Sequence, residues 1–405
     1  MKFRIGCIIL FLVSVLSLNA EVVDVYVVDS IGLEQKAEKV IHKVGFDVSP
    51  AYVLPTSKFF RGDNESGKRI NTHLSLHLKY GVQFGKDTYF GRNYPYAIQG
   101  IGITYNTFFN NSEIGNPAAL YAFQSSRIVT ISDKVSLDYE WNFGASFGWK
   151  KYNKETNPFN DVVGSNTNAY INLGLLFNWK FAPQWNLTAE VGLTHYSNGN
   201  TKYPNSGVNT LGVRVGIVRT FGRNKDRQNE RLIKPDEFKR YISYDLIVYG
   251  AVRKKGMSTP DNKFIVPGRF AVVGLNFNPM YNFSHYFRGG VSLDVQYDES
   301  ANIFSHAAGE GSLNEDTKYY RPPFIEQFSA GISVRAEVVM PIFAINIGIG
   351  KNFICKGADT NSFYQIFALK AYLTKGLFFH AGYQLYKFKE PNNLMLGIGY
   401  RFNAK

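Results

Sequence analysis

One short stretch of the chain carries the residue types of a hydrolase. His195 and Ser197 lie two positions apart in QWNLTAEVGLTHYS, residues 184–197. This segment alternates apolar and polar residues, which predicts a β-strand in which both side chains share one face. A histidine beside a serine hydroxyl can accept its proton and activate it as a nucleophile. The pair therefore indicates chemistry on an acyl group.

A third polar residue is expected to join this pair. Asn209 has the same phase as Leu211 in the following strand-like segment, residues 208–221. A hairpin closed over residues 198–207 can place Asn209 directly opposite His195. Three polar side chains would then converge at the end of an otherwise apolar face, with Asn209 holding the imidazole.

The connecting loop, NGNTKYPNSG, supplies candidate donors for an oxyanion. Asn205 and Asn198 carry amide side chains, and Gly199 offers a backbone N–H. Such groups stabilise the charge of a tetrahedral intermediate. The alternative is a polar turn without chemistry, because Asn and Gly favour turns on conformational grounds.

Long amphipathic strands must position this hairpin. In residues 135–149 every odd position is apolar or aromatic, whereas the even positions are small, polar or charged; residues 169–181 largely repeat the pattern. Lipid outside and a polar lumen inside explain that division in a transmembrane barrel. A soluble β-sandwich is the alternative, but it does not need strands of this length.

Sixteen strands are expected in two groups of eight. The connections within the first group mostly alternate between tight and long, as in outer-membrane barrels, although the 85–96 connection is longer than that scheme wants. The sequence predicts an all-β fold, an antiparallel transmembrane β-barrel with an eight-stranded N-terminal unit and a second β-rich unit of about eight strands. One merged barrel of sixteen strands stays open. The expected strands are 45–54, 72–84, 97–108, 118–131, 134–149, 166–181, 184–197 and 208–221, then 240–252, 264–276, 284–296, 325–339, 342–351, 363–374, 376–387 and 392–402.

The domain organisation follows from composition. Residues 1–20 resemble a secretory signal peptide, with Lys2 and Arg4 before an apolar run too short for a stable membrane helix, so export to the bacterial outer membrane is expected. An N-terminal segment (21–44) mixes a strand-like start with a helix-like IGLEQKAEKVIHKV. The first barrel unit (45–222) is followed by a charged linker (223–239) and the second unit (240–405).

Charge, cysteine content and histidine spacing limit which binding partners, disulfides and metal sites can be expected. The formal net charge is +13, or +11 without the signal peptide's Lys2 and Arg4, which favours anionic partners such as phosphorylated lipid headgroups. No nucleic-acid motif is present, so no nucleic-acid partner is expected. Cys355 would be alone after signal cleavage, so no disulfide is expected. His73 and His77 are too far apart in a strand for a metal pair, and neither they nor His380 predict a metal site.

HYSN followed by YPNSGVN resembles the active hairpin of the lipid A 3-O-deacylases, outer-membrane barrels that cleave the ester-linked acyl chain at the 3-position of lipid A. The resemblance implies that His195 is the general base and Ser197 the nucleophile, with Asn198 directly after it and Asn205 as an oxyanion-hole residue. It extends over residues 45–222, which makes the first unit a deacylase-like barrel. The ending FKEPNNLMLGIGYRF is similar to the long Bacteroidetes-type members described as acyloxyacyl hydrolases.

One residue departs from the family pattern. The triad acid of these enzymes is a glutamate, and the matching position here is Asn209. An amide can orient an imidazole, but it cannot stabilise the imidazolium as a carboxylate does. Three outcomes follow: a slow enzyme, an acid supplied from elsewhere, or a lost activity.

The preferred hypothesis is an outer-membrane serine esterase that removes an acyl chain, by resemblance the 3-O chain, from lipid A of lipopolysaccharide. It requires no metal or cofactor, and Lys202 in the loop could meet the lipid A phosphates. The rival is a non-catalytic outer-membrane barrel, either a pore or an envelope-binding scaffold, with a degenerate hydrolase hairpin. Esterase activity on phospholipids or other acylated lipids is a third possibility. The sequence leaves the oligomeric state and the role of residues 240–405 open.

Overall fold

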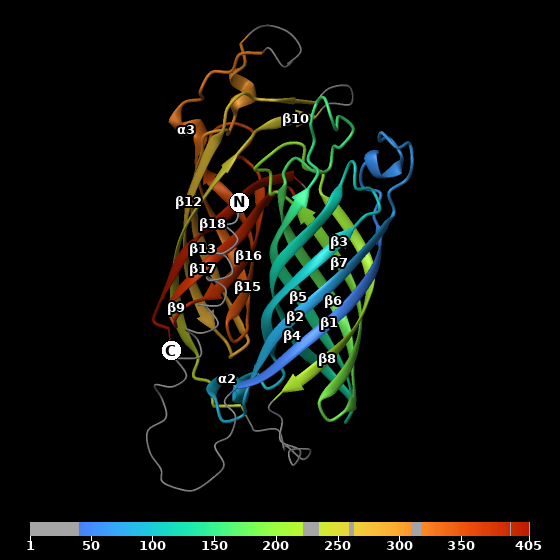
Figure 1. Cartoon of the computed structure of the whole chain (residues 1–405). Coiled ribbons are helices and arrows are strands. Elements are labelled where there is room, and N and C mark those ends of the chain that lie inside the picture. The colour runs from blue at the N-terminus through green and yellow to red at the C-terminus, as the bar shows by residue number, and fades with distance from the viewer. Residues whose placement is uncertain (1–39, 222–234, 259–262, 309–316, 389, 405) are drawn as a thin grey trace. The chain divides into compact units, whose positions relative to one another are not determined.

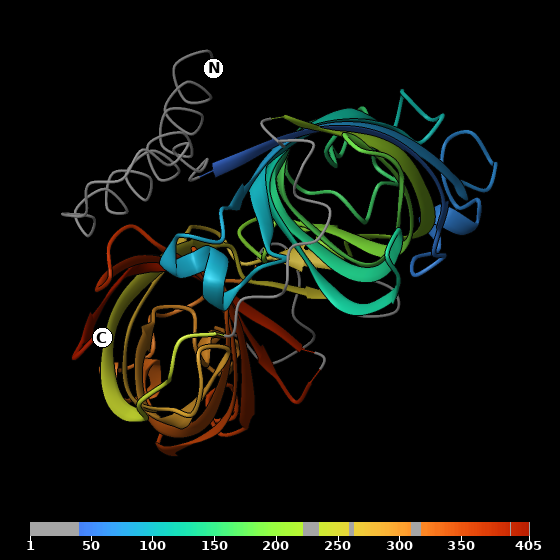
Figure 2. The same cartoon turned by 90° about the horizontal axis from the view of Figure 1, so that it is seen from below.

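The chain folds into two closed antiparallel β-barrels. The computed structural model describes residues 40–221, 235–258, 263–308, 317–388 and 390–404. Strands β1–β8 close the first barrel, and β9 with β12–β18 closes the second; each closed ring is visible in Figure 2. Pairing of β1 with β8 and of β18 with β9 excludes a merged barrel of sixteen strands. The predicted fold class is confirmed.

The first barrel contains eight strands, which are long and tilted (Figure 1). Strand β1 begins at Val40 rather than at residue 45, so the helix-like assignment of the residues just before 45 is wrong. Val40 pairs with Phe84, and His42 pairs with both Val82 and Phe221, so the ladder to both neighbours overrides local helix propensity. The bounds are β1 (Val40–Val53), β2 (Thr72–Phe84), β3 (Ile98–Thr107), β4 (Gly115–Ser132), β5 (Val135–Trp149), β6 (Thr167–Ala182), β7 (Trp185–Ser197) and β8 (Val208–Phe221).

The second barrel has the same strand number. Its bounds are β9 (Tyr241–Arg253), β12 (Phe270–Asn282), β13 (Phe287–Asp298), β14 (Phe328–Val339), β15 (Phe343–Ile354), β16 (Phe363–Tyr372), β17 (Leu377–Tyr386) and β18 (Glu390–Phe402). A separate two-stranded ribbon, β10 (Gly256–Ser258) with β11 (Lys263–Ile265), lies between β9 and β12 in the chain.

The predicted position of one strand of the second barrel, β12, is wrong. Residues 264–276 were expected, but β12 runs from Phe270 to Asn282. Gly268 has a φ of +106°, which is not an extended conformation, so β12 begins only after this residue. The strand then continues through Pro279, which pairs with Tyr244 of β9 although it has no N–H to donate. Proline therefore did not end the strand.

Short helical turns fill several connections. The long 85–96 connection contains α2 (Tyr89–Asn93), whose first turn is capped by the Thr88 hydroxyl accepting from the Gly91 N–H at 3.0 Å. The others are η2 (Phe59–Arg61), η3 (Ile303–His306) and α3 (Phe324–Gln327). In the described residues, no helix is long and apolar enough to cross a membrane. The predicted signal peptide and most of the predicted charged linker lie outside the described residues.

The two faces of each barrel differ as the alternation predicts. Outward side chains are apolar and exposed, for example Leu173 (61%) in the first barrel and Val334 (68%) in the second. Inward side chains are polar and buried, including His73, His77 and, in the second barrel, His380. An exposed apolar belt around a polar interior is the surface of a protein embedded in lipid.

Buried ion pairs fill the lumen of the first barrel. Lys79 Nζ lies 2.9 Å from Asp47 and 3.1 Å from Glu140. Arg214 donates to Glu140 at 2.8 Å and also pairs with Glu190. All five groups are at most 7% exposed. Each buried charge therefore has a partner, which a low-dielectric interior requires.

Buried ion pairs also fill the lumen of the second barrel. Lys370 contacts both Asp245, at 2.7 Å, and Glu337. Arg401 donates to Asp245 at 2.6 Å and to Glu337 at 3.0 Å. Arg288 adds a further bond to Glu337 at 2.8 Å. Both lumens are therefore occupied by side chains.

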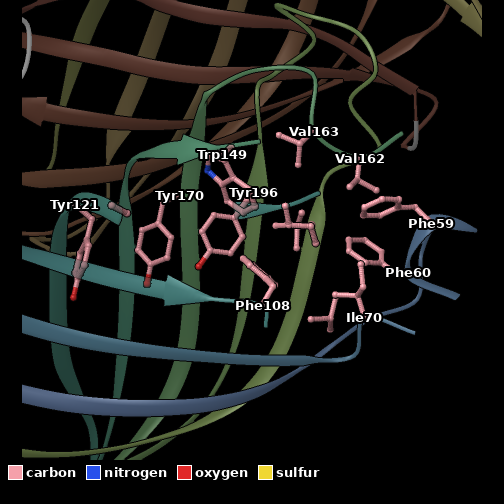
Figure 3. Close-up of a cluster of buried hydrophobic side chains, with 14 of the residues drawn as sticks. Phe59, Phe60, Ile70, Phe108, Tyr121, Trp149, Val162, Val163, Tyr170 and Tyr196 are labelled. Atoms are coloured by element: carbon pink, nitrogen blue, oxygen red, sulfur yellow. The ribbon is translucent and has the colours of Figure 1, made fainter. Parts of the chain in front are cut away.

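A cluster of buried hydrophobic side chains joins the strands of the first barrel to its connections (Figure 3). Phe59, Phe60 and Ile70 from the β1–β2 connection pack with Val162 and Val163 from the β5–β6 connection. All are at most 5% exposed. These long loops are therefore ordered on the barrel, and they lie at the end where β7 finishes and β8 begins.

Replacing Arg214 with methionine should unfold the first barrel more easily. The change leaves Glu140 and Glu190 buried with fewer positive partners, and breaking such a buried pair costs about 3–5 kcal/mol. The measurement is the free energy of unfolding in urea, in detergent micelles. Arg61→Met, at an exposed arginine, is the control and should change it by less than about 0.5 kcal/mol. Equal stability of the two variants would contradict the role of the ion network.

Candidate active site

The predicted pairing of His195 with Asn209 is present. The two residues are direct partners in the register of β7 and β8. Imidazole Nδ1 lies 2.7 Å from the Asn209 amide oxygen. An amide oxygen only accepts, so Nδ1 must carry the proton and Nε2 keeps its lone pair. Asn209 thus fixes the tautomer in which Nε2 can act as a base.

Ser197 lies on the same outward face of β7. A Cβ built on Gly207 would lie 3.1 Å from His195 Cε1 and 3.7 Å from Ser197 Cβ, so the two side chains flank the same glycine. The Ser197 hydroxyl makes no hydrogen bond to any residue the structure describes, His195 included. In unliganded sites such bonds are often long and tighten only when substrate is bound.

The loop between β7 and β8 is ordered by one hydrogen bond and by two residues with left-handed backbone. The Asn198 N–H donates to the Asn205 side-chain oxygen at 2.9 Å, which orients the amide of Asn205 with its nitrogen as the donor group. Asn198 is 4% exposed. Gly199 and Asn200 both have a φ of +61°, so the turn itself depends on left-handed backbone.

The β7–β8 hairpin is held in place by residues of other connections, which the sequence did not predict. The N–H groups of Ser206 and Gly207 donate to the carbonyls of Asp161 and Val162, at 3.4 and 3.2 Å. The Asp161 carboxylate accepts from the Ser57 hydroxyl at 2.5 Å. Val162 belongs to the cluster of Figure 3, so the packed loops support the catalytic candidates. No local motif marks these long-range contacts.

The surroundings of the hairpin are apolar. Ile171, Leu193 and Leu211, which lie on the same outward face, are between 39% and 55% exposed. His195, Ser197 and Asn209 are partly exposed. A polar cluster at the edge of a lipid-facing surface can be reached by an acyl chain from the side, without passage through the lumen.

Other histidines have structural surroundings. His73 contacts Asn106 at 3.2 Å, and His77 contacts Ser75 at 2.9 Å, both inside the first barrel. His380 is buried in the second barrel. Within the described ranges, no group of three or more His, Cys, Asp or Glu side chains is arranged to hold a metal ion.

Fold and surface together define an outer-membrane β-barrel protein. Residues 78–218 match the family model described as "Lipid A 3-O-deacylase (PagL)", and residues 242–404 match "Acyloxyacyl hydrolase, C-terminal domain". The two models cover most of the chain. The chain belongs to the lipid A 3-O-deacylase family, whose activity is ester hydrolysis.

Solved structures resemble this chain only weakly. Neisserial surface protein A is 13% identical, with a TM-score of 0.29 over 44% of this chain and 96% of that one. The siderophore receptor PirA from Pseudomonas aeruginosa is 8% identical, with a TM-score of 0.23 over 91% of this chain and 81% of that one. At TM-scores this low, these similarities carry no information about function. No curated protein matches the chain.

Gly207→Ala should reduce ester hydrolysis by about tenfold or more. Gly207 has a φ of +73°, and its added methyl would lie 3.0 Å from the Tyr196 carbonyl oxygen and 3.1 Å from Cε1 of the His195 imidazole, so the ring must shift. Gly148→Ala is the matched control: Gly148 has a φ of +95°, but a Cβ there meets nothing closer than 3.7 Å. Both variants should lose about 1–2 kcal/mol of unfolding free energy. Equal hydrolysis by the two variants would show that contact with His195 is unimportant.

Proposed function

We propose that this protein is an outer-membrane serine esterase that removes the ester-linked acyl chain at the 3-position of lipid A. The observation that carries the proposal is the 2.7 Å bond between His195 Nδ1 and Asn209, with Ser197 beside the same ring on the lipid-facing side. Family membership supports lipid A as the substrate. Export by a signal peptide in residues 1–20 is part of the proposal.

Each residue has a defined role in the proposed mechanism. Nε2 of His195 accepts the proton of the Ser197 hydroxyl as Oγ attacks the ester carbonyl. The Asn205 side-chain nitrogen, with the Gly199 N–H or the Asn198 amide, stabilises the oxyanion. The imidazolium then returns the proton to the departing 3-hydroxyl of the sugar. Water, activated by the same nitrogen, releases the fatty acid from Ser197.

The location of the hairpin suits a substrate that is itself part of the membrane. Lipid A can present its acyl chain to the outward face of β7 and β8 while its headgroup stays at the membrane surface. The apolar side chains beside Ser197 would then contact the chain being cleaved. Lys202, which is exposed in the loop, would contact a lipid A phosphate.

Asn209 makes a slow enzyme the expected outcome. Its amide orients the imidazole through the observed bond, but it carries no charge to balance the imidazolium that forms during attack. The described contacts of the imidazole include no carboxylate that could replace it. Orientation is therefore retained, and charge stabilisation is reduced.

The rival pore hypothesis has less support. Ion networks formed by Lys79, Glu140 and Arg214 in one barrel, and by Lys370 and Glu337 in the other, occupy the lumens. Two plugged eight-stranded barrels are what the enzymatic hypothesis expects. A non-catalytic scaffold remains the alternative outcome of the experiments below.

Ser197→Ala should abolish the loss of one hydroxyacyl mass from lipid A. Mass spectrometry of lipid A from cells expressing wild type, Ser197→Ala or Ser206→Ala measures this directly. Ser206 is an exposed serine of the same loop, so its variant should behave as wild type. Unchanged lipid A with well-inserted wild-type protein would overturn the lipid A assignment. Loss of a phospholipid acyl chain instead would identify a different acylated lipid as substrate.

Asn209→Asp should raise turnover at least tenfold, with Asn209→Glu as the longer alternative. A carboxylate accepting from Nδ1 would stabilise the imidazolium, and in a serine-protease triad the reverse change cost roughly 10⁴ in turnover. The measurement is the initial rate of acyl release from lipid A in detergent. Asn205→Asp introduces the same charge near the oxyanion and should lower the rate. A faster Asn205→Asp variant or an unchanged Asn209→Asp variant would contradict the proposed roles.

A further inference from the structure

The second barrel carries an unusual exposed loop before β14. Residues 318–325 read KYYRPPFI. Tyr320 is 64% exposed, Arg321 68% and Phe324 65%, and Lys318 and Ile325 are exposed as well. Large apolar side chains at this exposure, interleaved with cations, are typical of a membrane interface rather than of water.

An aromatic stack joins this loop to the lipid-facing surface. The rings of Tyr297 and Phe324 are 5.5 Å apart at 17°, and those of Phe324 and Phe328 are 5.5 Å apart at 23°. Tyr297 and Phe328 are direct partners between β13 and β14. They share the outward phase of Leu293 and Ile332, so Phe324 extends the lipid-facing surface past the ends of the strands.

Arg321 is held at the edge of this stack. One of its terminal nitrogens donates to the Tyr297 hydroxyl at 2.6 Å and to Glu299 at 3.2 Å. Its other guanidinium nitrogens make no hydrogen bond to residues the structure describes. A guanidinium that is fixed through one nitrogen and open at the others is suited to a bidentate contact with phosphate.

Further cations lie along the same edge. Lys351, exposed on β15, pairs with Ile332 of β14 and lies 5.5 Å from the ring of Phe363. Lys356 is 63% exposed, whereas its partner Glu326 is 16% exposed. Glu299, the partner of Arg321, is 30% exposed, so both cations are more accessible than the carboxylates they pair with. The edge therefore presents positive charge to an approaching ligand.

We infer that Tyr297, Lys318, Tyr320, Arg321, Phe324 and Phe328 form a second lipid A-binding surface, which takes the phosphorylated glucosamine disaccharide of one molecule. Flat aromatic faces suit the apolar faces of sugar rings, and the cations suit the phosphates. The acyl chains would lie along the exposed belt that includes Ile332 and Val334. This surface belongs to the second barrel, at the end with the long connections, and it requires no catalytic residue. The second barrel would thereby bind lipid A without cleaving it.

The test measures lipid A binding to the full-length Ser197→Ala protein in phosphatidylcholine nanodiscs. Because this variant cannot use Ser197, the result is independent of whether the proposed esterase activity exists. Lys318→Ala/Arg321→Ala is compared with Lys239→Ala/Arg240→Ala, which removes the same charges just before β9, at the opposite end of the same barrel. Native mass spectrometry counts bound lipid A, and heat-modifiable gel migration verifies folding.

The loop variant should bind lipid A about 25-fold more weakly, since it lacks two cations and each cation near a lipid surface contributes roughly a factor of five. The control should bind as the parent does. Dephosphorylated lipid A should bind the parent several-fold more weakly, and Phe324→Ser should weaken binding of intact lipid A. Equal binding by both double variants would overturn the inference. So would phosphatidylglycerol binding as tightly as lipid A, because that would show only general attraction of anions. If the loop variant does not fold, binding of lipid A to Phe324→Ser and binding of dephosphorylated lipid A to the parent test the inference. Undiminished binding in both measurements would overturn it.

Discussion

The structure depends on one constraint: inside a lipid bilayer, every backbone N–H and C=O must find a partner within the protein. Closure of β1 on β8, and of β18 on β9, meets that constraint without a free strand edge. Closure also separates two environments along each strand. Apolar side chains face lipid, and polar ones face a narrow lumen where their charges must be paired. The ion networks of Arg214 and Lys370 follow from this geometry.

The same closure explains why the candidate active site faces outward. A lumen filled by side chains has no room for an acyl chain, whereas the outer surface is already in contact with lipid. Polar residues at the end of a lipid-facing strand lie where the apolar layer meets the membrane surface. His195, Ser197 and Asn209 are in that position. The hairpin holds its shape because Asp161 and Val162 anchor its loop to the packed cluster beneath.

The two barrels share architecture but differ in what their surfaces offer. The first has a histidine–asparagine pair beside a serine on its outer face. The second has the aromatic stack around Phe324 with Arg321 at its edge. Binding of one substrate class by both barrels would give the second a reason to be retained in one chain with the first.

Sequence alone determined most of the strands, the inward and outward faces, and the partnership of His195 with Asn209. Period-2 alternation is a local property, and a hairpin brings its own residues together, so both can be read along the chain. The choice of two barrels over one needed the tertiary structure, because it depends on which distant strand β1 meets. The start of β1, the position of β12 and the support of the hairpin by Asp161 were also decided there. Each arises from contacts between residues far apart in the chain, for which no local pattern exists.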